Sequence, residues 1–412
     1  MSTRIIDKVN LGPIISPRNN QNIPIHNWYS FKHGFSRELA VHLIKNFGLS
    51  EGACVLDPFC GGGTTLLTCK ELGINARGFD ILPFSVFLSR VKIGDYEYDE
   101  LLEQLDSFKK KEIHGSLPQE GLPDIPLIKK AFSPAVELAL ITLKARIDSI
   151  SAPQLRQLSN LAFLSILESV SNTSKSGGFL RIVKRDVSPT LIEELFFAKI
   201  STMLNDVKEN NEFDKKRKVS IKVEVGDARK LITRRKFDAV ITSPPYPNRH
   251  DYSRIYSLEM IFDFVSTNQE LKNIRYDSIR SHVEARKKHE ALSYRKPTII
   301  DTLIKDMKTN GLNNLQITDM VEGYFEDMYL ALSEIHRCLR KGGKVGMVIS
   351  NVRFAGVNIL VDEILSEIGE QVGLAPEEIW AVRYKGNSSQ QMKNYERKPS
   401  RESIIIWGKH VH

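Results

Sequence analysis

The sequence places three consecutive glycines between an apolar run and a helical pattern. The apolar run covers residues 53–59, the glycines stand at 61–63, and the helical pattern covers residues 64–72. A second apolar run, over residues 74–81, comes directly after that pattern. Two strands joined by a helix form a βαβ unit, which requires a parallel sheet. We therefore expect an α/β fold built around this unit.

Further strand and helix patterns extend this unit into an open, doubly wound, mainly parallel sheet of seven strands. The other predicted elements are strands at residues 219–225, 237–243, 344–350, 379–384 and 403–408, and helices at 36–47, 324–339 and 358–372. Residues 1–27 are expected to form an extended arm, and Ser36 to cap the helix that follows. The pair Gly342 and Gly343 is expected to end the helix at 324–339.

Composition and cysteine spacing limit the class of protein. The formal net charge of +8, from 58 Lys and Arg against 50 Asp and Glu, favours a polyanionic partner, although similar excesses occur in proteins that bind no nucleic acid. No C-x-x-C spacing joins the cysteines, so we expect no zinc or other metal site and no disulfide framework. A reduced cytoplasmic compartment is expected, without a secretory leader or a membrane span. The cysteines are Cys54, Cys60, Cys69 and Cys338.

The glycine segment has the position of a ligand loop, because it follows a strand and opens a helix at the carboxyl edge of a sheet. An ordinary tight turn would also fit this position. Three consecutive glycines after an acidic strand end at Asp57 favour a ligand loop. No lysine stands between the glycines and Thr64, and this excludes a Walker-type phosphate loop.

Acidic residues end or follow two other predicted strands. Asp80 ends the strand at 74–81 and could accept hydrogen bonds from ribose hydroxyls, or cap the helix that begins near Pro83. Asp227 follows the strand at 219–225 and could accept from an adenine amino group, or form an Asx-turn. Both roles stay open at each position.

The most informative segment reads Thr-Ser-Pro-Pro-Tyr and ends at Tyr246. Pro244 and Pro245 lack backbone N–H donors and fix the direction of the chain, so nearby carbonyls are held outward as acceptors. The Ser243 hydroxyl and the Tyr246 ring stand beside them. An exocyclic amine on a flat base offers two donors and an aromatic face, which these groups complement. A rigid loop without a ligand would explain the two prolines alone.

The segments DPFCGGGTT and TSPPY together resemble the amino-group DNA methyltransferases that use S-adenosylmethionine. The Ser-Pro-Pro-Tyr form is similar to their cytosine-N4 branch, whereas the adenine-N6 branch usually has Asp-Pro-Pro-Tyr. The resemblance covers residues 28–92, 219–265 and 324–408 and implies a Rossmann-like class I methyltransferase core. Residues 27–39 resemble the element that closes over the amino-acid end of the cofactor, and the tail resembles that of bacterial modification methylases at 383–392 and 399–407.

This resemblance implies a role for each residue of the two motifs. Asp57 and the glycines would hold the methionine and ribose portion of the cofactor, Asp80 the ribose hydroxyls and Asp227 the adenine. The implied cofactor-binding set is Asp57, Phe59, Gly61, Gly63, Thr64, Asp80 and Asp227. The implied catalytic set is Ser243, Pro244, Pro245 and Tyr246.

The implied reaction is methyl transfer to the N4 amine of a flipped cytosine in duplex DNA. The implied setting is the modification arm of a restriction-modification or related defence system in a bacterial or archaeal cytoplasm, with a restriction endonuclease encoded nearby. The glycine loop precedes the Ser-Pro-Pro-Tyr loop here, opposite to the permuted order common among cytosine-N4 enzymes, so adenine-N6 methylation stays open. The sequence is also compatible with an RNA methyltransferase or a catalytically silent DNA-binding subunit.

A basic excess after the catalytic loop indicates where DNA would bind, since residues 265–320 carry ten Lys and Arg against seven Asp and Glu. The residues expected to contact DNA are Arg249, Arg286, Lys287, Lys288, Arg397 and Arg401. The expected organisation is an arm and first core part at 1–94, a mainly helical insert without a clear strand at 95–219, the catalytic core part at 220–264, a candidate target-recognition insert at 265–320, and the last core part at 321–412.

Overall fold

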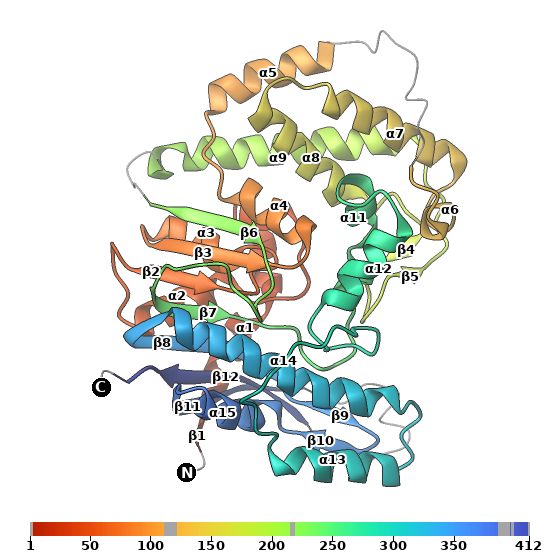
Figure 1. The fold of residues 1–412 in the computed structure, drawn as a ribbon. Coiled ribbons are helices and arrows are strands. Elements are labelled where there is room, and N and C mark those ends of the chain that lie inside the picture. Colours follow the sequence, from red (N-terminus) through yellow and green to blue (C-terminus); the bar gives the residue numbers. More distant parts are fainter. Residues whose placement is uncertain (1–2, 111–121, 215–218, 386–395, 397–398, 411–412) are drawn as a thin grey trace.

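The computed structural model describes residues 3–110, 122–214, 219–385, 396 and 399–410 (Figure 1). A sheet of eight strands lies at its centre, in the order β1-β11-β12-β8-β7-β2-β3-β6. Its strands are β1 (Arg4–Asp7), β2 (Cys54–Asp57), β3 (Asn75–Asp80), β6 (Ile221–Val225), β7 (Phe237–Thr242), β8 (Leu339–Ser350), β11 (Ala375–Lys385) and β12 (Ser400–Gly408).

The doubly wound, mainly parallel sheet is confirmed. Strand β12 runs antiparallel to β8 and β11, and the other neighbours in this sheet are parallel. The prediction of seven strands was one short, because residues 4–7 of the expected arm form β1 along the free edge of β11. Ile5 stands opposite Ile379 in that parallel pair.

Helices cover both faces of this sheet. Successive residues of a strand point to opposite faces, so neighbours in one strand pack against different helices. Val55 of β2 packs against the helices on one face, and Leu56 packs against the helices on the other face. The helices around the sheet are α1 (Gly12–Ile15), α2 (Arg37–Asn46), α3 (Thr64–Glu71), α4 (Pro83–Lys92), α14 (Gln316–Cys338) and α15 (Val361–Gln371), together with the 3-10 helices η1 (Val9–Leu11), η2 (Pro17–Asn22) and η3 (His26–Trp28).

Helix ends agree with the sequence-based expectation at α2 and differ at α14. Ser36 caps α2, since its Oγ accepts from the backbone N of Leu39 at 3.2 Å. The glycine pair does not end α14. That helix stops at Cys338, and the chain turns at once into β8, which contains both Gly342 and Gly343. Helix α15 begins later than expected because the residues before it form the hairpin of β9 (Val352–Phe354) and β10 (Val357–Ile359).

The described residues of the segment 95–219 form a mainly helical layer beyond α4, with α5, α7, α8 and α9 at the top of Figure 1. The expectation that it holds no strand was wrong at one place, where β4 (Thr173–Ser174) pairs with β5 (Arg181–Ile182). The boundaries of this insert and of the other segments stay predictions. Its helices are α5 (Tyr98–Lys110), α6 (Pro126–Ala131), α7 (Pro134–Asp148), α8 (Pro153–Ile166) and α9 (Thr190–Asp214).

The chain between the catalytic loop and α14 forms short helices joined by irregular segments. These are α10 (Tyr252–Ile255), α11 (Ser257–Asp263), α12 (Asn268–Asp277) and α13 (Thr298–Thr309). Buried residues of α11 join the core of the helical insert. In the part of the chain that the structure describes, no helix has the length and apolar character needed to cross a membrane.

Candidate functional site

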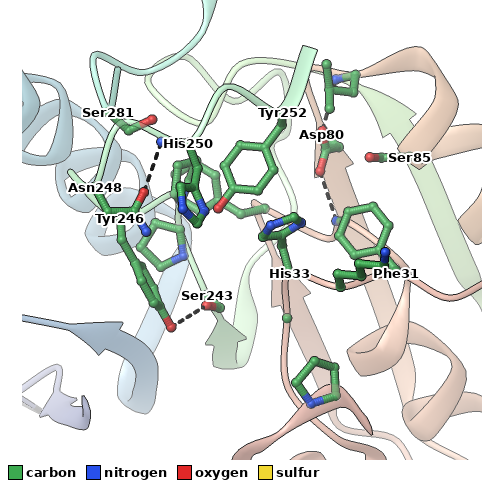
Figure 2. Close-up of a pocket in the computed structure, with 18 of the residues that line it drawn as sticks. Phe31, His33, Asp80, Ser85, Ser243, Tyr246, Asn248, His250, Tyr252 and Ser281 are labelled. Carbon is green, nitrogen blue, oxygen red and sulfur yellow. Dashed lines mark hydrogen bonds between the residues drawn. The ribbon is translucent and has the colours of Figure 1, made fainter. Parts of the chain in front are cut away.

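A cavity of about 770 Å³ opens at the carboxyl edge of the central sheet (Figure 2). Its walls include Phe59 after β2, Asp80 at the end of β3, Asp227 after β6 and Ser243 after β7. The strand order β7-β2-β3-β6 brings these four strand ends together. A smaller cavity of about 190 Å³ adjoins the large one and shares Phe59 and Ser243 with it.

Most of the site residues predicted from the sequence line one of these cavities. The large cavity is lined by Phe59, Gly61, Asp80, Asp227, Ser243, Pro244, Pro245 and Tyr246, and the small one by Asp57, Phe59, Gly61, Thr64 and Ser243. Gly63 lines neither cavity. It stands directly before α3 with a φ of 77°, and a Cβ there would lie 2.7 Å from the Ser89 hydroxyl oxygen. This position therefore requires glycine for the turn into α3 and for the close packing against Ser89.

Asp80 holds the glycine loop. Its Oδ2 accepts from the backbone N of Gly61 at 2.9 Å, and its Oδ1 accepts from the backbone N of Leu82 at 2.9 Å. Burial raises the pKa of Asp80 to about 6, although these N–H groups act in the opposite direction. The interpretation of Asp80 as a helix cap was wrong, because α4 has Leu82 at its N-cap and no side-chain cap.

Asp57 ties the end of β2 to the end of β7. Its Oδ1 accepts from the Thr242 hydroxyl at 2.6 Å and from the backbone N of Phe59 at 3.2 Å. The side chain is buried, and this burial raises its pKa to about 6. The glycine loop and the Ser-Pro-Pro-Tyr loop are therefore held together through one carboxylate.

The segment before α2 covers the glycine loop. The Phe31 ring lies so close that a Cβ on Gly61 would stand 2.9 Å from its edge, and one on Gly62 would stand 2.9 Å from the Cβ of Phe31. The Phe31 ring also stacks on Tyr256 at 4.8 Å between centroids. Ser30, Phe31 and His33 line both cavities, so this part of residues 27–39 forms a wall of the site.

The Ser-Pro-Pro-Tyr loop faces the glycine loop across the large cavity. The Ser243 and Tyr246 hydroxyl oxygens are 3.4 Å apart, a weak contact in which either could donate. Burial, and after it the nearby Glu402 charge, raises the pKa of Tyr246 well above its ordinary value. The phenol therefore stays protonated at neutral pH.

Figure 2 shows His33 and Tyr252 between the two loops, with His250 beside the catalytic loop. His33 Nδ1 lies 3.2 Å from the Tyr256 hydroxyl, and its ring meets Tyr252 edge-on at 5.0 Å. Burial, then His250, lowers the pKa of His33 to about 3, and burial also lowers that of His250. Both rings are neutral at pH 7. The sequence analysis did not predict His33, His250 or Tyr252 as site residues, although His250 and Tyr252 closely follow the catalytic motif.

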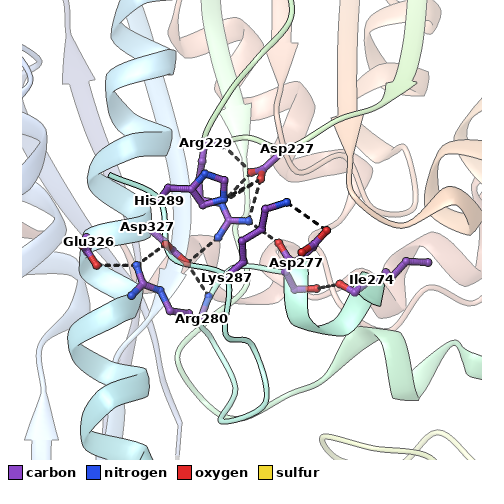
Figure 3. A network of polar contacts seen from close by, with 10 residues as sticks. Asp227, Arg229, Ile274, Asp277, Arg280, Lys287, His289, Glu326 and Asp327 are labelled. Carbon is purple, nitrogen blue, oxygen red and sulfur yellow. Dashed lines mark hydrogen bonds and ion pairs between the residues drawn. The ribbon is translucent and has the colours of Figure 1, made fainter. Parts of the chain in front are cut away.

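Asp227 belongs to a network of charges beside the cavity (Figure 3). Arg229 is buried between Asp227, whose Oδ2 it reaches at 2.8 Å, and Asp327 of α14 at 3.0 Å. Arg280 donates to the other Asp327 oxygen at 2.6 Å. Burial alone would raise the pKa of Asp227, but Arg229 brings it below its ordinary value.

The Asx-turn predicted as one role of Asp227 is present. The backbone N of Arg229 donates to Oδ1 of Asp227 at 2.9 Å. The same side chain also lines the large cavity. Its contact with adenine stays a prediction.

Three charged residues of β11 and β12 form the wall beside Tyr246. Arg383 Nε donates to Oε2 of Glu402 at 2.8 Å, and Lys385 Nζ donates to its Oε1 at 2.7 Å. All three residues line the large cavity, and Glu402 is buried. Two basic residues therefore stand in the wall with one carboxylate between them. No motif marked them as site residues.

The residues predicted to contact DNA fall into different environments. Arg249, Arg286, Lys287 and Lys288 are exposed. Lys287 pairs with Asp277 at 3.2 Å, and Arg286 lies 5.1 Å from the centroid of the Tyr276 ring. Arg397 lies outside the described residues.

Arg401 has a place inside the fold instead. Its Nε donates to Oδ2 of the buried Asp362 at 2.8 Å, and its Nη2 to Glu363 at 2.7 Å. Its side chain is 15% exposed, so these contacts support a structural role and give no support to DNA binding. All four cysteines are buried and unpaired. Among the described residues, no group of His, Cys, Asp and Glu is placed to hold a metal ion.

A family model and two curated relatives relate this chain to DNA methylases. A family model for N6 and N4 methyltransferases, described as DNA methylase, matches residues 12–89. The Type II methyltransferase M.BsoBI of Geobacillus stearothermophilus is 34% identical, over 96% of this chain and 88% of its own length. The Type II methyltransferase M.AvaI of a Nostoc species is 30% identical, over 96% and 89%. A solved TehB-like SAM-dependent methyltransferase from Corynebacterium glutamicum is 12% identical over 95% of this chain and 99% of its own, with a TM-score of 0.30.

Proposed function

We propose that this chain, which belongs to the amino-group DNA methylase family and is a Type II DNA methyltransferase of the N4/N6 class, methylates the exocyclic N4 amine of cytosine in duplex DNA. Its cofactor is S-adenosylmethionine, which supplies the methyl group from a sulfonium centre. The observation that carries the proposal is that residues 243–246 line the same cavity as Asp80 and Asp227.

The described residues fit this cofactor. Gly61 and Gly62 present only backbone to the cavities, and carboxylates stand at both ends of the site, Asp57 in the small cavity and Asp227 in the large one. Asp80 also lines the large cavity, with both oxygens turned to backbone N–H groups, and it can still accept from ribose hydroxyls through its remaining lone pairs.

In this proposal, the protein promotes methyl transfer by positioning the exocyclic amine. Pro244 and Pro245 offer no N–H, so the Ser243 hydroxyl and the Pro244 carbonyl act as acceptors for the two N–H groups of the amine. These hydrogen bonds hold the nitrogen with its lone pair toward the methyl group. Burial keeps His33 and His250 neutral. The proton released by the amine passes to water, either directly or through the Ser243 hydroxyl.

The target base must leave the duplex to reach this wall. Tyr246 offers a phenol ring for stacking. Among the described residues, Ser243 is the one hydrogen-bond partner of its hydroxyl. Base stacking on an aromatic side chain contributes roughly 1–3 kcal/mol. Tyr246 is therefore proposed as the stacking partner of the flipped base.

The wall beside Tyr246 supports cytosine over adenine. Next to its amine, the edge of cytosine carries two acceptors, N3 and O2, whereas adenine carries N1 and a C–H. Arg383 and Lys385 are donors that face the cavity from β11. Each has N–H groups beyond those that Glu402 takes. We propose that they donate to cytosine O2 and N3.

Exposed basic residues after the catalytic loop are proposed to bind the DNA backbone. Arg286, Lys287 and Lys288 lie on the irregular segment after α12, and Arg249 lies on the loop after Tyr246. They would set affinity through phosphate contacts and leave sequence reading to other groups. A cognate restriction endonuclease is the proposed biological partner, as expected for a Type II modification enzyme.

The test is product identification. Purified protein is incubated with plasmid DNA and S-adenosylmethionine, and the digested nucleosides are analysed by mass spectrometry against a sample without cofactor. N4-methylcytosine is expected. N6-methyladenine would overturn the cytosine assignment and leave the enzyme class in place. A parallel incubation replaces the plasmid with tRNA. Methylation of tRNA but not of DNA would overturn the assignment of DNA as the substrate.

A further inference from the structure

The small cavity holds two opposite buried charges. Asp57 stands in its wall with 2% of the residue exposed, and Lys92 stands in the same wall with 4% exposed. Gly61, Gly62 and Thr64 line this cavity with them. A carboxylate and an ammonium that face one cavity are the complement of a zwitterion.

Lys92 lacks a counter-ion in the part of the chain that the structure describes. Its Nζ donates to the backbone carbonyls of His26 at 3.0 Å and Gly62 at 3.3 Å. An ammonium has three N–H groups, so these carbonyls leave one without a partner. Burial, then the positive charge of Lys199, lowers the pKa of Lys92 to about 7. Burying a cation without an opposite charge is unfavourable, and an anion in the cavity would remove that penalty.

We propose that Lys92 binds the α-carboxylate of the methionine portion of S-adenosylmethionine, opposite Asp57 at the α-ammonium. The cavity in which both side chains stand adjoins the large one through Gly61 and Ser243. A ligand that fills both therefore places its amino-acid end between the two charges and its remaining atoms along the glycine loop. This proposal depends on the cofactor and is independent of whether the target base is cytosine or adenine.

A purely structural role is the competing explanation, because Lys92 also joins the glycine loop to the segment before α2 through its two carbonyl contacts. The two explanations differ in which ligands they affect. A lost structural contact weakens every ligand of the site. A lost carboxylate contact weakens only ligands that carry a carboxylate.

The experiment compares S-adenosylmethionine with its decarboxylated analogue by calorimetric titration. The wild-type protein is expected to bind the cofactor at least about tenfold more tightly than the analogue, as for a charge-assisted hydrogen bond. Lys92→Met is expected to lose this preference by weakening the cofactor alone. Equal affinity of the wild-type protein for both ligands would overturn the proposal without any variant.

Lys199→Met is the matched control. Lys199 is another lysine close to the segment before α2, donating to the carbonyl of Asn27 at 3.0 Å, but it lines neither cavity. Its substitution should keep the preference for the carboxylated ligand. If Lys92→Met weakens both ligands equally, Lys92 is a structural residue and the proposal is wrong. Circular dichroism shows whether each variant is folded, and the wild-type comparison stands if Lys92→Met is not.

Discussion

The backbone N–H of Gly61 donates to Oδ2 of Asp80 at 2.9 Å, so the carboxylate that ends β3 holds the loop that follows β2. Gly61 has a φ of 48°, a conformation that residues other than glycine rarely adopt. Asp80 therefore preorganises the site in the absence of a ligand, because it fixes the loop that forms one wall of both cavities.

We expect Asp80→Ala to weaken cofactor binding by about 1.5–3 kcal/mol, since both the loop anchor and the ribose acceptor are lost. Asp80→Asn should have a smaller effect, because one amide oxygen can still accept from Gly61. Calorimetric titration measures the affinities, and thermal unfolding shows how much of the loss is a loss of folding. Unchanged affinity in a folded Asp80→Ala protein would remove Asp80 from the cofactor site.

Cofactor affinity should fall as the pH drops below about 6. Burial raises the pKa of Asp57 and of Asp80 to about 6, so near pH 5 both carboxyl groups are mostly protonated. The ribose hydroxyls and the ammonium group of the cofactor donate to the ionised carboxylates, so at low pH the cofactor must displace the protons bound there. Each protonated carboxyl group then lowers the affinity by up to about tenfold per pH unit below its pKa. Titrations between pH 5 and 7 check this. A flat profile would contradict it, and Asp80→Asn should show a shallower one.

Neutralising Arg286, Lys287 and Lys288 together should weaken DNA binding and flatten its salt dependence. Each lost phosphate contact lowers the slope of log K against log salt by roughly 0.9. Arg401→Gln is the control. It should lower thermal stability, because it leaves the buried Asp362 without its ion pair, and should keep the salt slope. The reverse pattern would move the DNA surface to β12.

The fold could be predicted because the hydrophobic pattern and the glycine turns record it locally. The strand at β1 could not, since Arg4–Asp7 belongs to a polar segment that continues into several prolines, and it is a strand only because the edge of β11 accepts it. The glycine pair after α14 was misassigned for a related reason. A Gly-Gly pair after a helical pattern is typical of a helix end, but here Gly343 lies against the carbonyl of Asp238, where a strand must pass closely.

The candidate site was predictable where a motif carries it and not where the fold assembles it. Ser243 and Asp80 stand at strand ends, and the shared sheet edge brings them together. His33 comes from a loop and Lys92 from the end of α4, and they line the small cavity because the fold brings both elements to the glycine loop. Arg401 shows the opposite limit, because its charge suggested DNA but its partner, Asp362, is distant in sequence.

The Tyr246 ring, more than its hydroxyl, should decide methyl transfer. Its hydroxyl has only the 3.4 Å contact to Ser243 among the described residues, and its raised pKa keeps it protonated, so it is a poor base. Tyr246→Phe should therefore retain most activity, whereas Tyr246→Ala should lose roughly 1–3 kcal/mol of base stacking, about 5- to 150-fold in kcat/KM. Both variants should bind the cofactor as the wild-type protein does, because the ring lies on the far side of the cavity from Asp80 (Figure 2). Methyl transfer to duplex oligonucleotides gives kcat/KM, and calorimetry gives the cofactor affinity. If Tyr246→Phe is as inactive as Tyr246→Ala, the hydroxyl takes part in the chemistry. If Tyr246→Ala is fully active, another ring of the cavity wall, such as Tyr252, stacks on the base.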